Sequence, residues 1–466
     1  MKDSQKFDFS RVSDACVKCG KCRPDCTIFK VSRDEVRSPR GFLDLAGAYH
    51  RGELELSKEA KATFESCFLC TTCVTQCPTN LPVDEVIEHL RADIAEKYGI
   101  AWYKRLFFWL TKHRRVMDFL ARVGYYFVPC AFKHQDEPSC GGCAKKTRSN
   151  SVLTKPAFAA REMKPRFSLP FLNAERTLPT VSKRSFLNSH PELIDNGGSR
   201  QVGIFIGCMA NYAYTNVGES LLEICKKLKL NVHLMKQQSC CGSPAYFTGD
   251  LKTARELAKK NVAYFEEVLK TCEVIICPEA TCSAMLNSDY ARILASDEQW
   301  AARADAVCAK VLMASEFFAK KSNLKEVLRQ NALKKVTQIA ISQEDAAQKA
   351  DFSRLKVTYH DACHAKKVQN IFKEPRELLR EVCDIQEMQD LTSCCGFGGV
   401  TMQTQNYHLA REVGVARARQ IDEVKEAQVV AAECSACRLQ LNNSLGLIKS
   451  ELRVKNTVEL IAEGLK

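Results

Sequence analysis

Residues 393–399 read SCCGFGG, and this stretch, with the cysteines on either side of it, decides how the chain folds. YHDACHA precedes it at residues 359–365, and ECSACR follows it at residues 433–438. The three stretches contribute five cysteines: Cys363, Cys394, Cys395, Cys434 and Cys437. Adjacent cysteines point apart in most backbones, so such a pair does not close onto one partner without strain. We therefore predict an iron–sulfur cluster site, with a set of buried free thiols as the alternative. The glycine after the pair would let the backbone approach inorganic sulfide.

The same pattern occurs once earlier in the chain, which indicates a duplication. Cys240-Cys241-Gly242 follows Cys208 at an interval one residue longer than that from Cys363 to Cys394. Each copy opens with an apolar run, at 202–206 and 355–359, and continues through a helix-forming stretch, at 251–269 and 407–424. A second apolar run precedes the last cysteines of each copy. This alternation predicts two α/β domains with short parallel sheets and cysteines in the loops at the strand ends.

The two copies differ at one ligand position. Glu279 stands where the later copy has Cys434, so the earlier copy has four of the five thiolates. We predict a four-ligand site there, with Cys277 as a weaker additional candidate: Cys208, Cys240, Cys241 and Cys282. Four other cysteines have no counterpart in the other copy, and we expect them to be packed core thiols: Cys225, Cys272, Cys308 and Cys383.

The first hundred residues carry two further cysteine runs. CVKCGKCRPDC begins at residue 16 and CFLCTTCVTQC at residue 67, and both have the spacing C-x2-C-x2-C-x3-C of two-cluster ferredoxins. In that arrangement, three cysteines of a run bind one cubane and the fourth binds the other. The predicted [4Fe–4S] ligand sets are Cys16, Cys19, Cys22 and Cys77 for one cluster, and Cys67, Cys70, Cys73 and Cys26 for the other. Zinc knuckles are the alternative, but they do not need four cysteines in each run.

The residues around these runs have helical patterns. Residues 40–54 read RGFLDLAGAYHRGEL, with apolar side chains at helical spacing. Pro82, followed by Asp84 and Glu85, is typical of a helix start. A helical domain with two clusters is therefore predicted, and it suits one-electron relay.

Residues 101–134 combine aromatic and basic side chains. A helix here would place Trp102, Leu106 and Trp109 on one face, with Lys104 and Arg105 beside them. Such a helix fits an anionic membrane surface, and the alternative is a helix packed on the protein's own core. We expect no nucleic-acid partner, because no recognisable nucleic-acid module accompanies the patch.

Residues 135–199 are rich in proline and end in Asn196-Gly197-Gly198, which predicts a basic linker or an extended wrap over a neighbouring domain. Cys140 and Cys143 lie inside it as CGGC. They would form a redox-active pair, contribute to a metal site or have no essential role.

The composition places the chain among metal or redox proteins of a reducing compartment. It has 466 residues and 25 cysteines, and its polar start MKDSQKFDFS is not a secretory leader. No apolar run is long enough to predict a transmembrane span. The net charge of +13 is concentrated in residues 101–190.

Two histidines flank Cys363, and no dinucleotide fingerprint is present. His360 and His364 are candidates to donate a hydrogen bond to cluster sulfur or to carry a proton, with ordinary packing as the alternative. CGFGG lacks the G-x-G-x-x-G spacing, so we expect the chain to bind no flavin or nicotinamide itself.

The paired cysteine runs, the two Cys-Cys-Gly units and the final CSACRLQL resemble the iron–sulfur subunits of glycolate oxidase, lactate utilisation proteins and anaerobic glycerol-3-phosphate dehydrogenase. They also resemble the catalytic subunit of heterodisulfide reductase. The resemblance covers residues 10–100 and 200–460. It implies a non-cubane [4Fe–4S] cluster on the five cysteines of the later copy, a separate flavoprotein dehydrogenase as partner, and membrane quinone as electron acceptor. Because of Glu279, it leaves open which further iron–sulfur cluster, if any, the earlier copy binds.

We therefore predict a multidomain α+β protein. Its parts are a helical dicluster ferredoxin domain (1–100), a basic aromatic amphipathic helical segment (101–134), a Pro-rich basic linker (135–199) and two Cys-Cys-Gly domains (200–350 and 351–466). The predicted function is electron transfer from a flavoprotein, which oxidises a 2-hydroxy acid or glycerol 3-phosphate, to membrane quinone. The expected location is cytoplasmic, peripheral on the inner face of the cell membrane. A heterodisulfide-reductase-like enzyme acting at the Cys363–Cys437 site is the alternative, and a redox-sensing regulator is a third.

Overall fold

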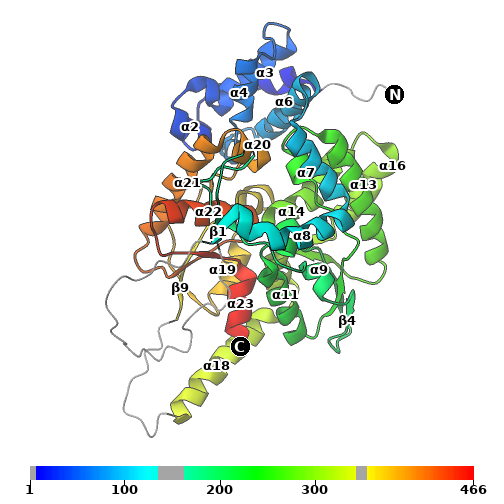
Figure 1. The fold of residues 1–466 in the computed structure, drawn as a ribbon, viewed down its shortest axis with the longest axis vertical. Coiled ribbons are helices and arrows are strands. Elements are labelled where there is room, and N and C mark those ends of the chain that lie inside the picture. Colours follow the sequence, from blue (N-terminus) through cyan, green and yellow to red (C-terminus); the bar gives the residue numbers. More distant parts are fainter. Residues whose placement is uncertain (1–6, 135–161, 170, 343–353) are drawn as a thin grey trace.

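The computed structural model describes residues 7–134, 162–169, 171–342 and 354–466 (Figure 1). Cys140 and Cys143 lie outside these residues. The ferredoxin module occupies one end of the molecule, and the two duplicated units form the rest.

The ferredoxin module is helical, as predicted. Its helices are α1 (Phe9–Ser13), α2 (Thr27–Ser32), α3 (Pro39–His50), α4 (Lys58–Glu65), α5 (Thr72–Gln76) and α6 (Val83–Tyr98), with a 3-10 turn at Glu35–Arg37. Ser38 caps α3 by accepting a hydrogen bond from the Gly41 amide, and Pro39 occupies its first turn. Phe42 of α3, Phe64 of α4 and Val86 of α6 are buried in the core of this module.

The first duplicated unit contains a five-stranded sheet in the order β4-β6-β5-β7-β8. The strands are β4 (Leu193–Ile194), β5 (Gln201–Ile204), β6 (Asn231–Leu234), β7 (Ile275–Cys277) and β8 (Val311–Met313). All pairings are parallel except that of β4 with β6. β4 falls within the stretch that the sequence predicts to be a linker, so that stretch ends inside this sheet.

Helices surround this sheet and connect its strands. They are α9 (Phe186–Ser189), α10 (Cys208–Tyr212), α11 (Thr215–Lys227), α12 (Ser243–Tyr246), α13 (Leu251–Val268), α14 (Ala280–Ala284), α15 (Tyr290–Leu294), α16 (Glu298–Cys308), α17 (Ala314–Lys320) and α18 (Leu324–Ser342), with a π turn at Met285–Asp289.

The second unit repeats this plan with a four-stranded parallel sheet in the order β10-β9-β11-β12. Its strands are β9 (Lys356–Tyr359), β10 (Asp384–Ile385), β11 (Val429–Ala431) and β12 (Val454–Lys455). Its helices are α19 (Lys373–Leu379), α20 (Gly399–Thr404), α21 (Tyr407–Asp422), α22 (Ser435–Leu447) and α23 (Thr457–Leu465), with a π turn at His364–Val368. In both units the cysteines follow the carboxyl ends of parallel strands, where α/β folds bind ligands.

The two units contact each other through equivalent loops. The Ala280 amide donates to the Glu433 carbonyl at 2.7 Å, and Asn456 donates to the Pro278 carbonyl at 3.2 Å. The last helix, α23, packs against α11 of the first unit. The cysteine-bearing loops of the two copies therefore lie side by side.

The segment after the ferredoxin module forms a helical hairpin of α7 (Trp102–Lys112) and α8 (Arg114–Ala131). It crosses the two duplicated units in Figure 1. A small antiparallel sheet follows it, made of β1 (Phe132–His134), β2 (Glu162–Pro165) and β3 (Leu178–Pro179). Trp102, Leu106 and Trp109 are exposed and not packed on the protein's own core, whereas Lys104 points inward and is buried.

Candidate functional site

One cavity of about 240 Å³ collects the cysteines of both copies. Four lining thiols come from the first unit and five from the second: Cys208, Cys240, Cys241 and Cys282, then Cys363, Cys394, Cys395, Cys434 and Cys437. Cys70 of the ferredoxin module also lines it. The carboxyl ends of the two sheets thus face a common space, and nine predicted ligands from duplicated segments lie around it.

The thiols of the second set form a continuous group. Cys394 lies beside Cys363 and Cys395, and Cys437 lies beside Cys395 and Cys434, close enough for the thiols to affect one another's pKa. The five side chains come from three segments that are distant in sequence, so the fold and not the local chain brings them together. Gly396 has a φ of +86°, and a Cβ there would meet the backbone of Gly414 at 2.7 Å. The glycine is therefore required for close packing on α21.

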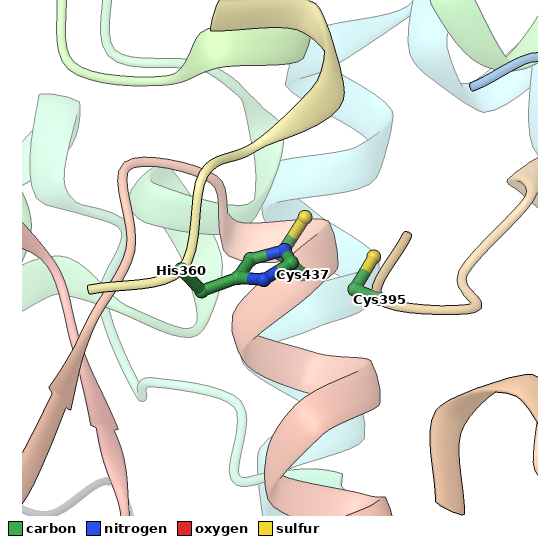
Figure 2. Close-up of side chains that lie close together, drawn as sticks. All are labelled: His360, Cys395 and Cys437. Atoms are coloured by element: carbon green, nitrogen blue, oxygen red, sulfur yellow. The ribbon is translucent and has the colours of Figure 1, made fainter. Parts of the chain in front are cut away.

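His360 completes this set. A ring nitrogen of His360 and the sulfurs of Cys395 and Cys437 all lie within 4.8 Å of one another, and Figure 2 shows the three side chains converging from separate segments. Nδ1 accepts a hydrogen bond from Arg417 Nε at 3.3 Å, which leaves the proton on Nε2. Burial lowers the pKa of His360 and favours this neutral form. Nε2 is buried without a hydrogen-bond partner among the described residues.

This geometry fits a bound iron–sulfur cluster. Several converging thiols supply the ligand chemistry, and the orphaned Nε2–H of His360 would donate to cluster sulfur.

In the first unit, Gly207 lies beside the thiol of Cys282, which belongs to a different ligand loop. A Cβ at Gly207 would lie 3.2 Å from Cys282 Sγ, so glycine leaves room beside that thiol.

The four thiols of the first unit also lie close together, but the residues around them differ from those around the second set. Cys241 contacts Cys240 and Cys282, and Cys240 contacts Cys208. The position equivalent to His360 is Phe205, which is apolar and fully buried. The set therefore has thiols but lacks the histidine of its twin.

Glu279 lines the cavity, but its carboxylate is engaged by the other copy. It accepts hydrogen bonds from the Ser435 amide at 2.6 Å and the Ser435 hydroxyl at 2.5 Å. Burial and the nearby Cys434 raise the pKa of Glu279 to about 8. The side chain that replaces a thiolate thus fixes the start of α22, between Cys434 and Cys437 of the second set.

Other cysteines lie away from this space. Cys277 is fully buried beneath the loop and is not among the described residues that line the cavity. The four cysteines without counterparts are buried in the core, as expected: Cys225, Cys272, Cys308 and Cys383.

The eight ferredoxin cysteines divide into the two predicted groups. Cys22 is close enough to Cys16, Cys19 and Cys77 for their thiolates to raise its pKa, after the larger effect of burial. Likewise, burial raises the pKa of Cys73, and the nearby thiolates of Cys67, Cys70 and Cys26 raise it further. The first group is nearer the surface, since Cys19 is exposed.

The second ferredoxin group touches the second copy directly. Cys70 lies next to Cys394, close enough for each thiol to affect the pKa of the other. Lys367, which the cysteine pattern does not single out, lies at this junction. Its Nζ donates to Thr72 Oγ1 at 2.5 Å and to the Thr392 carbonyl at 2.8 Å, and it lies 3.9 Å from Cys363 Sγ. The only feature of the sequence that points to Lys367 is its position four residues, about one helical turn, after Cys363.

His364 lines the same cavity as the cysteines. Its ring stacks on Phe247 of the first unit, with centroids 5.4 Å apart. Burial lowers its pKa to about 4, so the imidazole is neutral. Of the two candidate histidines, His360 thus belongs to the second cysteine set, and His364 bridges the two units.

Comparison with known proteins agrees with this architecture. Residues 12–81 match the 4Fe-4S dicluster domain, and residues 202–287 and 357–442 each match the Cysteine-rich domain. The chain belongs to the iron–sulfur proteins that combine these domains. The family predicted from the sequence is thereby confirmed. The α7–α8 hairpin lies outside the three matched ranges.

Relatives within this iron–sulfur family are distant in sequence. A "Probable glycolate oxidase iron-sulfur subunit" of Bacillus subtilis (strain 168) is 25% identical, over 83% of this chain and 79% of its own length. "Lactate utilization protein A" of Geobacillus thermodenitrificans (strain NG80-2) is 27% identical, over 56% of this chain and 98% of its own. An uncharacterised iron–sulfur protein of Methanocaldococcus jannaschii is 24% identical, over 96% of this chain and 71% of its own length. Within the described ranges, no helix combines the length and apolarity needed to cross a membrane.

Proposed function

We propose that this chain is the electron-transfer subunit of a dehydrogenase complex. A flavoprotein partner would oxidise a small 2-hydroxy acid, such as glycolate or lactate, or glycerol 3-phosphate, and the electrons would leave for membrane quinone. The names of the relatives support the first part, and two groups of four ferredoxin thiols support a relay. Bound clusters would supply the one-electron steps, since iron–sulfur centres change oxidation state one electron at a time.

The observation that carries the proposal is the contact between Cys70 and Cys394. It brings the second ferredoxin group next to the second cysteine set. The first group, with its exposed Cys19, forms the other end of the series. These positions support the proposal that electrons enter near the exposed Cys19 and pass toward the buried cavity.

Buried hydrogen bonds tie the ferredoxin module to both duplicated units. Arg91 is buried and donates to the Cys67 carbonyl at 2.6 Å and to the Phe247 carbonyl at 2.8 Å. It therefore ties the ferredoxin ligand loop to the first unit. Lys367 ties the same module to the second unit through Thr72. Fixed distances between redox centres are what a relay requires.

The test is reduction of the anaerobically purified chain by a flavoprotein dehydrogenase of a related complex and its hydroxy acid. EPR should show cluster reduction only when substrate and flavoprotein are both present. If the clusters stay oxidised with every candidate hydroxy acid and with glycerol 3-phosphate, although dithionite reduces them, the proposal fails.

A disulfide reductase is the second candidate, and one observation favours it. Both cysteine sets line one cavity, where a bound disulfide would meet thiolates from two sides. Reduced viologen supplies electrons without a flavoprotein. Steady turnover of an organic disulfide with viologen would favour this candidate, and cluster reoxidation by quinone alone would favour the first.

A further inference from the structure

The two ligand loops that precede α14 and α22 pack against each other. The Ala280 amide, at the start of α14, donates a hydrogen bond to the Glu433 carbonyl at 2.7 Å. Glu279 accepts hydrogen bonds from the amide and the hydroxyl of Ser435, at the start of α22. Each helix start is therefore fixed by the loop of the other copy, and side chains of the first unit reach the surroundings of Cys434.

Thr281 is the side chain that makes this approach. Its Oγ1 lies 3.3 Å from Cys434 Sγ, at hydrogen-bonding distance for sulfur. The two residues are 153 positions apart and belong to different units. A thiolate that binds iron carries no proton, so the hydroxyl of Thr281 is the donor and the sulfur is the acceptor. The first unit thus directs a hydrogen bond at a predicted ligand of the second set.

Cys434 is buried, and Thr281 is held beside it. Cys434 is 3% exposed, so this hydrogen bond forms away from bulk water. Thr281 is the second residue of α14 and directly precedes Cys282, a predicted ligand of the first set. The helix and the contacts between the two loops therefore fix its backbone. Hydrogen bonds to ionised groups are stronger than those between neutral groups, and a low local dielectric strengthens them further.

The equivalent positions of the two copies do not exchange this contact. Thr281 aligns with Ala436, since each stands one residue before the last cysteine of its pattern. Alanine has no hydroxyl, so the second unit cannot return the hydrogen bond from this position. Cys434 in turn aligns with Glu279, which is a carboxylate and not a thiol. The contact between these loops thus supplies a hydroxyl to sulfur in one direction, from the first unit to the second set.

We infer that Thr281 is a positioning residue of the first unit that raises the reduction potential of a cluster on the second set, acting through the Cys434 thiolate. Hydrogen bonds to the sulfurs are among the features that set the potential of an iron–sulfur cluster. A donor at the thiolate stabilises negative charge, and the reduced cluster carries one more electron than the oxidised one. In this step one electron enters from the ferredoxin module, and the Thr281 proton stays on its oxygen. The inference rests on the proposed function for the source of that electron.

A redox titration of the anaerobically purified full chain, followed by EPR, tests this inference without a flavoprotein. Thr281→Val keeps the branched shape of the side chain but removes the donor. It should lower the equilibrium constant for reduction of this cluster by about tenfold, which is about 59 mV for a one-electron couple. Thr281→Ser keeps the hydroxyl and should stay close to wild type.

Thr457→Val is the matched control. Thr457 is a buried threonine of α23 whose hydroxyl has no hydrogen-bond partner among the described residues. Its replacement by valine makes the same chemical change without removing a donor from sulfur, so the potential should equal that of wild type.

Equal potentials of wild type and Thr281→Val, at equal iron content, would overturn the inference. So would a serine variant that shifts as far as the valine variant, because the hydroxyl would then not be the cause. Loss of about four irons in the valine variant would also overturn it, since Thr281 would then retain the cluster and not tune it. None of these outcomes touches the proposed function, which is tested by reduction through the flavoprotein. Failure of that reduction would leave the measured potentials, and with them this inference, unchanged.

Discussion

Lys367 is a buried cation placed between two groups of thiols. Burial alone would lower its pKa, but the thiolates of Cys363, Cys70 and Cys394 raise it above the ordinary value, so the amine is charged. It contacts the ferredoxin module through Thr72 and the second unit through Thr392. A fixed positive charge favours the more negative, reduced form of a neighbouring cluster.

Lys367→Met should therefore lower the reduction potential of the cluster on the Cys363–Cys437 set. Each 1.4 kcal/mol of lost charge stabilisation corresponds to about 59 mV for a one-electron couple. EPR-monitored redox titration measures the shift. Lys367→Arg, which retains the charge, should stay much closer to wild type. Equal potentials for the Met and Arg variants would show that the charge does not act on the cluster.

At the residue scale, the sequence identifies ligand candidates but not their partners. All nine predicted cysteines of the duplicated units line the cavity, because cysteine spacing survives as a pattern. The hydrogen bond from Ser435 to Glu279 joins residues 156 positions apart, and that from Lys367 to Thr72 spans 295. Such contacts depend on how two units pack, which no local pattern encodes.

At the element scale, the two ligand loops support each other. The loop before α14 supplies the Glu279 carboxylate to Ser435, and the loop before α22 supplies the Glu433 carbonyl to Ala280. Glu433 is itself held by Ser315 and Tyr359, each at 3.1 Å. One loop thus stabilises the other at the positions of their cysteines.

Glu279→Ala should destabilise the protein, because it leaves the buried donors of Ser435 without an acceptor. A loss of about 1–3 kcal/mol is expected for such a change. The measurement is the thermal midpoint under anaerobic conditions, together with iron content. Glu279→Gln retains one acceptor oxygen and should lose less. An unchanged midpoint and iron content in the alanine variant would mean that the loop keeps its shape without this contact.

Most elements follow from the sequence, and their orientation does not. The apolar runs predicted at 202–206 and 355–359 appear as β5 and β9, and the predicted helices appear as α13 and α21. These patterns are local and periodic. The rotation of α7 was less predictable, because Lys104 is buried by Thr401 and Gln405, which are distant in sequence. A charged side chain in an amphipathic helix is predicted to be exposed to solvent unless its buried hydrogen-bond partners are known.

At the scale of the whole molecule, the ferredoxin module is seated on both copies but connects to them unequally. Arg91 and Glu88 contact the first unit, at Phe247 and Tyr246. Its thiols, however, meet the second set, through Cys70 and Cys394. The two copies therefore differ in their surroundings. The second set lies next to a ferredoxin thiol, and the first unit has Phe205 and Glu279 in place of a histidine and a thiolate.

This asymmetry predicts how iron distributes over the chain. Two cubanes account for about eight irons, and a [4Fe–4S] cluster on the second set raises the total to about twelve. Replacing Cys363 and Cys437 together by Ser should remove about four irons and leave the EPR signals of both cubanes, since those have their own ligands. Cys383→Ser, at a buried core thiol, is the control and should lose none. Loss of all iron in the double variant would instead mean that the second set is needed for the ferredoxin module to fold, and a wild-type count would place no cluster on Cys363 and Cys437.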